Sequence, residues 1–196
     1  MKVVLCGPPH SGKSCLREGL KQAIMPIHRA GKAPYPYVIT ACPDGEGSWY
    51  AETARRNPDL AKQLKADYKA KFTLKFAQEK AIAVRNVCLP FTLIDVGGKI
   101  DEKNVLIMSH ATHAVILAGD MTEVPNWKKF CSQLNLQIIA VIYSDYYGTK
   151  DCLTSELPII EGSIHYLERG EDVSKRPTVQ ALAHLLIKLS TIYFPK

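Results

Sequence analysis

The chain lacks the long apolar runs and the cysteine patterns that identify several classes of protein. No stretch approaches the roughly 18 consecutive apolar residues of a membrane-spanning helix, so we expect no membrane partner. The apolar run at the start ends at Pro8, before the ~7–15-residue core that a signal peptide needs. The six cysteines form no CxxC pair and no tight cluster, which predicts small, reduced and mostly buried thiols. Together these absences predict a cytoplasmic protein.

The composition is that of an ordinary globular protein. The 196 residues are 46% hydrophobic and 22% charged. They contain no internal repeat and no low-complexity tract, so we expect one domain over residues 1–196. The formal net charge is +6, from 25 Lys and Arg against 19 Asp and Glu. A positive balance favours phosphate-bearing ligands, and it leaves a nucleic-acid partner open.

Short apolar runs alternate along the chain with segments of helical periodicity. Strands are predicted at Lys2–Cys6, Tyr35–Ala41, Leu89–Val96, His113–Gly119 and Gln137–Tyr143, with one or two more within Leu157–Leu167. Helices are predicted after Lys13, within Pro58–Asn86, and at Glu102–His110, Val124–Leu134 and Pro177–Tyr193. This alternation is typical of an α/β fold, a three-layer, doubly wound and mostly parallel sheet. Ligands of such sheets bind beyond the carboxyl ends of the strands.

The segment Pro58–Asn86 combines aromatic and apolar residues at four-residue steps with many lysines between them. Its length predicts two helices or one kinked helix. An amphipathic helix with a lysine-rich solvent face is the favoured interpretation. A surface for a substrate or a polynucleotide is the alternative.

The strongest motif begins directly after the first predicted strand. The segment Gly7-Pro8-Pro9-His10-Ser11-Gly12-Lys13-Ser14 matches G-x-x-x-x-G-K-[ST] at every specified position, and Cys15 follows in the predicted helix. The two glycines permit a tight turn whose N–H groups reach phosphate oxygens, and the helix points its N-terminus at the same place. Lys13 is predicted to neutralise β- and γ-phosphate charge, and the Ser14 hydroxyl to bind Mg²⁺. We expect His10 to be an exposed loop side chain.

A second motif ends the apolar run Phe91-Thr92-Leu93-Ile94-Asp95. A carboxylate at the end of such a strand holds Mg²⁺ in P-loop proteins, directly or through a water, so Asp95 is predicted as a metal ligand. Asp95 and Gly98 also fit a D-x-x-G pattern, in which the glycine N–H reaches the γ-phosphate and senses hydrolysis. The alternative is an aspartate that merely ends a strand before a turn.

Other positions depart from familiar nucleotide-binding patterns. Val96 follows Asp95 where many ATPases have a glutamate, and Lys99 stands where Ras-like GTPases have a water-orienting glutamine. No N-K-x-D guanine-reading motif follows Gln137–Tyr143. We therefore expect ATP rather than GTP as the nucleotide.

Several further polar residues are candidates for water activation, phosphate binding or metal binding. Asp44, Glu46 and Asp120 follow predicted strands, although loop or capping roles are favoured for each. Arg55 and Arg56 could stabilise transferring phosphate. His110 and His113 have an H-x-x-H spacing, for which a zinc site is the less favoured interpretation.

The two motifs resemble those of the P-loop NTPase superfamily, and this resemblance implies the P-loop NTPase fold. More narrowly, GPPHSGKS, Ala41–Trp49 and Leu93–Gly98 together resemble the AAA-like P-loop domain of CRISPR-associated proteins. That domain is often fused to a ring nuclease that degrades cyclic oligoadenylates. The resemblance implies an auxiliary role in type III CRISPR signalling, with a CRISPR-associated protein as partner. No segment of the chain is assigned to the nuclease.

Three functions follow from these observations. The first is a Mg-dependent regulatory NTPase that binds and hydrolyses ATP, with a partner or as a homo-oligomer. The second is a small-molecule or nucleotide kinase. The third is a binding switch controlled by the nucleotide, with little catalysis.

Overall fold

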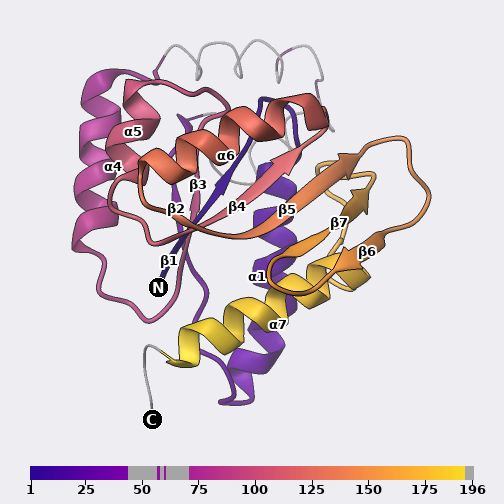
Figure 1. Ribbon diagram of the computed structural model, residues 1–196. Coiled ribbons are helices and arrows are strands. Elements are labelled where there is room, and N and C mark those ends of the chain that lie inside the picture. The colour runs from indigo at the N-terminus through magenta and orange to yellow at the C-terminus, as the bar shows by residue number, and fades with distance from the viewer. Residues whose placement is uncertain (44–56, 58–59, 61–70, 193–196) are drawn as a thin grey trace.

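The computed structural model of the chain describes residues 1–43, 57, 60 and 71–192 (Figure 1). Its centre is a seven-stranded sheet in the order β2-β3-β1-β4-β5-β7-β6. The strands are β1 (Lys2–Cys6), β2 (Tyr37–Thr40), β3 (Thr92–Asp95), β4 (His113–Ala118), β5 (Gln137–Asp145), β6 (Cys152–Ser155) and β7 (Ile160–His165). All neighbours are parallel except β6 and β7, which pair antiparallel at the edge.

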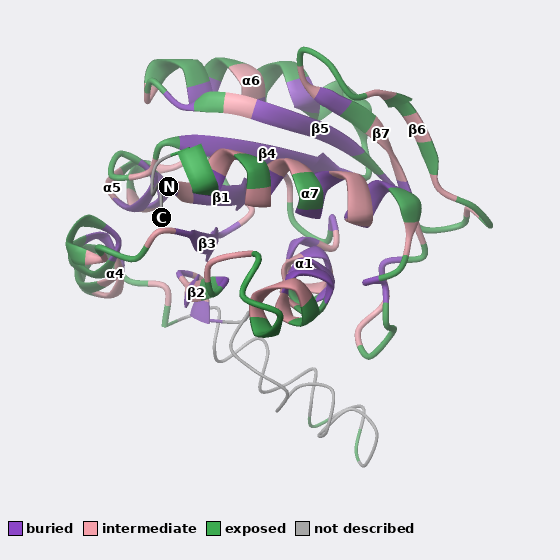
Figure 2. Ribbon diagram, turned by 90° about the horizontal axis from the view of Figure 1, so that it is seen from below, coloured by how far each residue is buried: buried purple, intermediate pink, exposed green. Residues whose placement is uncertain are grey.

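Helices cover both faces of the sheet, which gives three layers (Figures 1 and 2). One face carries α1 (Lys13–Arg29) and α7 (Pro177–Ile192), which contact each other. The other carries α4 (Leu74–Asn86), α5 (Glu102–Met108) and α6 (Val124–Gln133), the last preceded by the 3₁₀ turn η2 (Met121–Glu123). The α/β class and the mostly parallel three-layer sheet are therefore as predicted.

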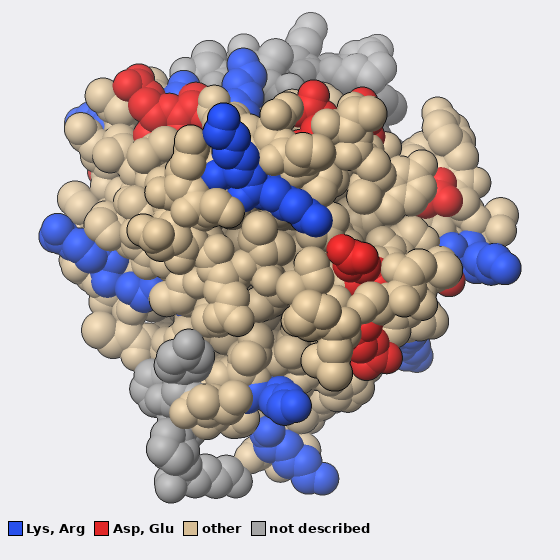
Figure 3. All heavy atoms as spheres, in the orientation of Figure 1, with Lys and Arg blue, Asp and Glu red and all other residues tan. Residues whose placement is uncertain are grey.

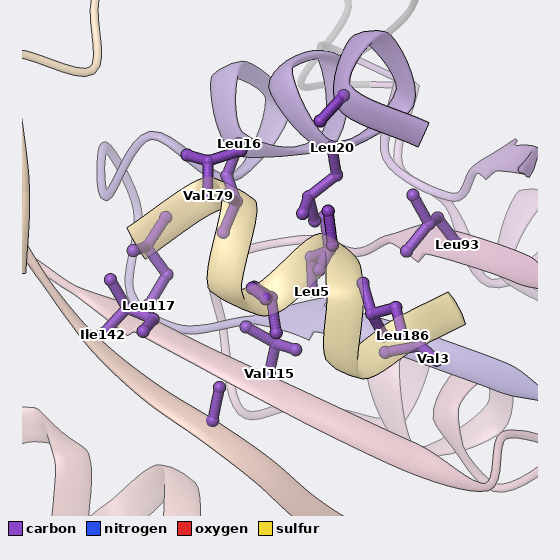
Figure 4. Close-up of a cluster of buried hydrophobic side chains, with 14 of the residues drawn as sticks. Val3, Leu5, Leu16, Leu20, Leu93, Val115, Leu117, Ile142, Val179 and Leu186 are labelled. Atoms are coloured by element: carbon purple, nitrogen blue, oxygen red, sulfur yellow. The ribbon is translucent and has the colours of Figure 1, made fainter. Parts of the chain in front are cut away.

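Successive side chains of β1 point to opposite faces of the sheet, so this strand contributes to both hydrophobic cores. Val3 and Leu5 face the cluster under α1 and α7, whereas Val4 and Cys6 face the cluster under α4, α5 and α6. All four side chains are fully buried, as a central parallel strand requires. The first cluster is completed by the predicted stripe of α1, with Leu16 and Leu20 directed at α7 and the sheet (Figure 4).

The ends of two helices are fixed by side-chain caps that the sequence supplies locally. The Thr73 hydroxyl accepts from the Phe76 N–H at the start of α4, and the Asp101 carboxylate accepts from the Asn104 N–H at the start of α5. Each such cap contributes about 1 kcal/mol. By contrast, the N-cap residue of α1 is Gly12, which has no side chain to cap the helix.

Several element boundaries differ from the sequence prediction. β3 begins at Thr92 instead of Leu89, because its partner β1 begins with Lys2 opposite Thr92. One or two strands are predicted within Leu157–Leu167, but β6 lies before that range, at Cys152–Ser155. The segment after Tyr147 joins the same sheet through β7, and α7 packs on α1.

The expectation that the cysteines are mostly buried is wrong. All six are free thiols, but only Cys6 and Cys131 are buried. Cys88 follows the end of α4 and Cys152 lies on the edge strand β6, so both are exposed. In the part of the chain that the structure describes, no helix has the length and apolar character needed to cross a membrane.

Candidate functional site

A cavity of about 560 Å³ lies beyond the carboxyl ends of the parallel strands. Its walls come from the segments that follow β1, β2, β3, β5 and β7. Residues 9–14 of the Gly7–Ser14 segment line it, because this segment connects the central strand β1 to α1. The cavity thus lies where a doubly wound sheet binds its ligands.

The shape of the Gly7–Ser14 loop depends on two glycines. Gly7 has φ +135°, and a β-carbon there would lie 1.9 Å from the Leu117 carbonyl oxygen. Gly12 has φ +79°, and a β-carbon there would lie 2.7 Å from the Leu167 β-carbon. His10 is exposed, as expected, and adopts φ +62°, a left-handed conformation uncommon outside glycine.

The Lys13 ammonium group is folded into the loop that carries it. Its Nζ donates to the carbonyl oxygens of Gly7 at 3.0 Å and Pro8 at 2.7 Å. The Ser11 hydroxyl donates to the same Pro8 oxygen at 2.9 Å. Lys13 is only 8% exposed, so its charge is held at the floor of the cavity by dipoles of the loop itself.

Ser14 and Asp95 meet although 81 positions separate them. The Ser14 hydroxyl donates to Asp95 Oδ2 at 2.8 Å. They meet because β1 and β3 are direct neighbours in the sheet, which brings the end of β3 beside the start of α1. The Asp95 side chain is 2% exposed, so this carboxylate is removed from bulk water.

Arg17 also contacts Asp95, which the sequence motifs did not indicate. Its guanidinium lies 3.3 Å from Asp95 Oδ2 and donates to the Thr40 hydroxyl at 3.2 Å. The Arg17 side chain is 11% exposed. The buried carboxylate is therefore paired with a positive charge, as buried charges generally are. One helical turn separates Arg17 from Lys13, and this spacing is the only feature of the sequence that could have indicated that Arg17 belongs to the site.

The loop after β3 packs directly on the Gly7–Ser14 loop. A β-carbon on Gly98 would lie 2.5 Å from the Pro9 nitrogen. Asn104 of α5 is fully buried and holds this loop, since its side-chain amide donates to the carbonyls of Gly97 at 2.9 Å and Lys99 at 2.6 Å. Sequence analysis did not identify Asn104 as a residue of the site.

One part of the cavity extends from Lys13, Ser14 and Asp95 past Gly98, and we name this part the Asp95 end. Beyond Gly98 it has a basic wall. Lys99, Asp101, Lys103 and Phe72 line it. Lys103 Nζ lies 5.0 Å from the centre of the Phe72 ring and donates to the Phe72 carbonyl at 3.1 Å. Phe72 also contacts Phe76 edge to face. Lys103 and Phe76 therefore both hold the Phe72 ring in place.

On the other side of β1, the cavity ends at residues that follow β5 and β7, and we name this part the Tyr146 end. Its lining residues are Cys15, Tyr146, Leu167, Glu168 and Arg169. The Tyr146 hydroxyl donates to Glu168 Oε2 at 2.7 Å. This hydrogen bond raises the pKa of Tyr146 to about 12, so the phenol stays protonated at neutral pH. Partial burial raises the pKa of the Cys15 thiol to about 11, so Cys15 is neutral as well.

The structure brings most of the predicted site residues to one cavity. The lining includes Pro9, His10, Ser11, Gly12, Lys13, Ser14, Cys15, Asp95 and Gly98. Gly7 and Pro8 lie outside the lining and contribute the carbonyls that hold Lys13.

The remaining polar candidates do not reach this cavity or lie outside the described residues. Asp120 is exposed and caps the 3₁₀ turn η2 by accepting from the Thr122 N–H. His113 is buried with Nδ1 2.8 Å from the Thr112 hydroxyl, whereas His110 is exposed. Within the ranges that the structure describes, no group of three or more His, Cys, Asp or Glu side chains is arranged to hold a metal ion. Asp44, Glu46, Arg55, Arg56 and most of the lysine-rich segment before Lys71 fall outside those ranges.

Surface charge is mixed on the face that carries α6. Figure 3 shows basic and acidic side chains interspersed there, with a basic group over α6. Among the residues that the structure describes, this face has no continuous basic surface of the kind that backbone contacts to a nucleic acid use. The basic side chains behind the net charge of +6 are thus not concentrated on the described part of that face.

A scan against models of known protein families found no match, and a search of curated proteins found none either.

Proposed function

We propose that the chain is a P-loop protein that binds a Mg-nucleoside triphosphate, ATP in preference to GTP, as a regulatory NTPase. The observation that carries the proposal is the hydrogen bond of 2.8 Å between Ser14 and Asp95. The sequence predicts these two oxygens as ligands of one ion, and their distance is compatible with that role. Lys13 adds a buried positive charge at the same loop.

The donor set suits magnesium. Mg²⁺ prefers oxygen ligands and is held by one or two protein side chains together with phosphates and water, and bound there it would neutralise charge on the β- and γ-phosphate oxygens. The Arg17 guanidinium, 3.3 Å from Asp95 Oδ2, also compensates the charge of this carboxylate.

The remaining contacts to the nucleotide come from the chain's own groups. Lys13 exchanges its contacts with the Gly7 and Pro8 carbonyls for phosphate oxygens. The uncapped start of α1 directs backbone N–H groups at the same phosphates. Gly98, which packs on Pro9, places the loop after β3 beside the γ-phosphate. We expect slow turnover, because Lys99 stands where related switch proteins orient water with a glutamine.

The test is turnover of ATP, GTP, CTP and UTP with Mg²⁺, measured as phosphate release and compared with Lys13→Ala. We expect ATP hydrolysis in the wild type and its loss in the variant. Hydrolysis that is unchanged in Lys13→Ala would reject the proposal for this site.

A kinase is the second candidate, and the Asp95 end of the cavity favours it. Lys99 and Lys103 line the space beyond Gly98, where a phosphate-bearing acceptor would face the γ-phosphate. Screening nucleotides and phosphorylated metabolites with γ-labelled ATP tests this function. Transfer of label to an acceptor would favour the kinase, and transfer to water alone would argue against it.

A binding switch and a role beside CRISPR proteins are proposals that rest on the motifs alone. The switch predicts partner or oligomer affinity that differs between ATP and ADP while turnover stays negligible. The CRISPR setting predicts that a cyclic oligoadenylate, or a CRISPR-associated partner, changes nucleotide turnover.

A further inference from the structure

The Asp95 carboxylate is shared between two side chains of α1. Asp95 Oδ2 accepts from the Ser14 hydroxyl at 2.8 Å and lies 3.3 Å from the Arg17 guanidinium. Ser14 and Arg17 are three positions apart, so they lie on the same face of the helix. The oxygen proposed above as a ligand of Mg²⁺ is therefore already in contact with a positive charge.

A second contact keeps Arg17 beside this carboxylate. Its guanidinium also donates to the hydroxyl of Thr40 at 3.2 Å, and Thr40 ends β2 directly opposite Asp95 in β3. The Arg17 side chain is 11% exposed and that of Asp95 is 2% exposed, so water screens their charges only weakly. Arginine does not lose its proton in proteins, so the positive charge at this place is permanent.

This charge opposes a metal ion at Asp95. A divalent cation bound to Asp95 and Ser14 would lie close to the guanidinium, and repulsion between like charges is strong where water is scarce. A nucleoside triphosphate removes this obstacle, because its phosphate oxygens add negative charge and supply further ligands to the ion. The site then holds enough negative charge for the guanidinium and the metal ion together.

We propose that Arg17 makes metal binding at Ser14 and Asp95 dependent on the nucleotide. Without phosphates, the guanidinium keeps the ion away from the carboxylate. With them, the ion enters as part of the metal–nucleotide complex. The inference rests on the proposed function and adds a residue that neither sequence motif contains. Arg17 acts through Asp95 and is therefore a positioning residue for the metal ion.

The experiment is equilibrium dialysis without nucleotide, with Mn²⁺ as the probe because it takes the same oxygen ligands as Mg²⁺. We expect the wild type to retain little Mn²⁺ up to millimolar concentration. Arg17→Gln keeps a side-chain N–H donor but lacks the charge, and it should bind Mn²⁺ at least about tenfold more tightly than the wild type. Arg17→Lys keeps the charge and should behave like the wild type.

Two controls assign the gain to this site. Arg29 is exposed at the other end of α1, roughly 18 Å from Arg17 along the helix axis. Arg29→Gln changes the net charge equally and should leave Mn²⁺ binding unchanged. Adding Asp95→Asn to Arg17→Gln should abolish the gain. Circular dichroism shows whether each variant is folded, and Mn²⁺ should raise the melting temperature of Arg17→Gln but not that of the wild type.

The outcomes separate the role of Arg17 from the proposed function. Tight Mn²⁺ binding by the wild type without nucleotide overturns that role and leaves the P-loop proposal standing, and so does a folded Arg17→Gln that binds Mn²⁺ no better than the wild type. If Arg17→Gln folds only when Mn²⁺ is present, that dependence shows the same gain, whereas a variant that Mn²⁺ does not rescue contradicts it.

The same dialysis with a non-hydrolysable ATP analogue tests the function on which the inference rests. The analogue should make the wild type retain Mn²⁺. If it does not, the proposed function fails and the role of Arg17 fails with it.

Discussion

The two ends of the cavity are built differently. At the Asp95 end, Lys13 and Asp95 are 8% and 2% exposed, and each charge is held by several short contacts. At the Tyr146 end, Tyr146 is 44% exposed and its neighbour Tyr147 is 92% exposed. A buried charge without partners would be costly, so the Asp95 end must be formed before any ligand arrives. The exposed side chains of Tyr146 and Tyr147 should tolerate substitution without loss of the fold, and this difference determines what each substitution should do.

The largest effect should come from Gly7→Ala, which tests whether the loop geometry is tied to the fold. The new β-carbon would clash with the Leu117 carbonyl at 1.9 Å and force φ +135° on an alanine. Backbone strain and overpacking each cost about 1–3 kcal/mol. We therefore expect the free energy of unfolding in urea to fall by about 3 kcal/mol or more.

Gly31→Ala is the matched control. Gly31 also has a positive φ of +71°, but a β-carbon there would meet no atom within 4 Å. Only the strain of roughly 1–2 kcal/mol should remain. An equal loss in the two variants would show that the close approach to Leu117 is not the cause.

A smaller effect is expected for Asn104→Ala, which sharpens the comparison within the Asp95 end. The substitution removes the donor to the Gly97 and Lys99 carbonyls, at a cost of about 1–3 kcal/mol for unpaired buried groups. The loop that carries Gly98 then loses its position beside Pro9. The preference for an ATP analogue over ADP should decrease in parallel titrations.

Asn126→Ala on the exposed surface of α6 is the control, and neither stability nor nucleotide preference should change there. If Asn104→Ala lowers stability but leaves the preference intact, Asn104 supports only the fold and has no positioning role in the site.

The smallest effect should come from the opposite end of the strands, at His113, the first residue of the central strand β4. Burial lowers the pKa of His113 below its ordinary value of 6.5. The unfolded chain therefore binds a proton at His113 before the folded protein does, so this contribution to stability is present above pH 6.5 and decreases as the pH falls below it. Urea unfolding between pH 8 and 5 should show less loss of stability at low pH in His113→Asn than in the wild type. An identical pH profile in both proteins would contradict this assignment.

The sequence predicted the Asp95 end far better than the Tyr146 end, for a physical reason. A phosphate is bound by consecutive backbone groups, so Gly7–Ser14 carries the whole pattern in one segment. Asp95 could be placed beside Ser14 because parallel strands bring their carboxyl ends together. The sequence did not identify Arg17 and Asn104 as residues of the site. Their roles depend on the atoms that the folded chain brings next to them, and no local pattern indicates those atoms.

The Tyr146 end has no local pattern. Tyr146 and Glu168 are 22 positions apart and meet only because β5 and β7 are neighbours in the sheet. The sequence indicated strands in both places but not their order. In the sequence, the antiparallel edge strand β6 lies between β5 and β7. Nothing in the sequence indicated that β5 and β7 pair with each other and leave β6 at the edge.

The most direct test of the central claim is the affinity for a non-hydrolysable ATP analogue with Mg²⁺ and with Mg²⁺ removed by a chelator. The measurement uses the wild type, Lys13→Ala and Ser14→Ala. We expect Mg²⁺ to strengthen binding to the wild type. We also expect Ser14→Ala to lose most of this dependence, and Lys13→Ala to weaken binding about 100-fold through lost charge-assisted hydrogen bonds. Binding that is indifferent to Mg²⁺ and to both substitutions, or no binding to the wild type at all, would contradict the central claim.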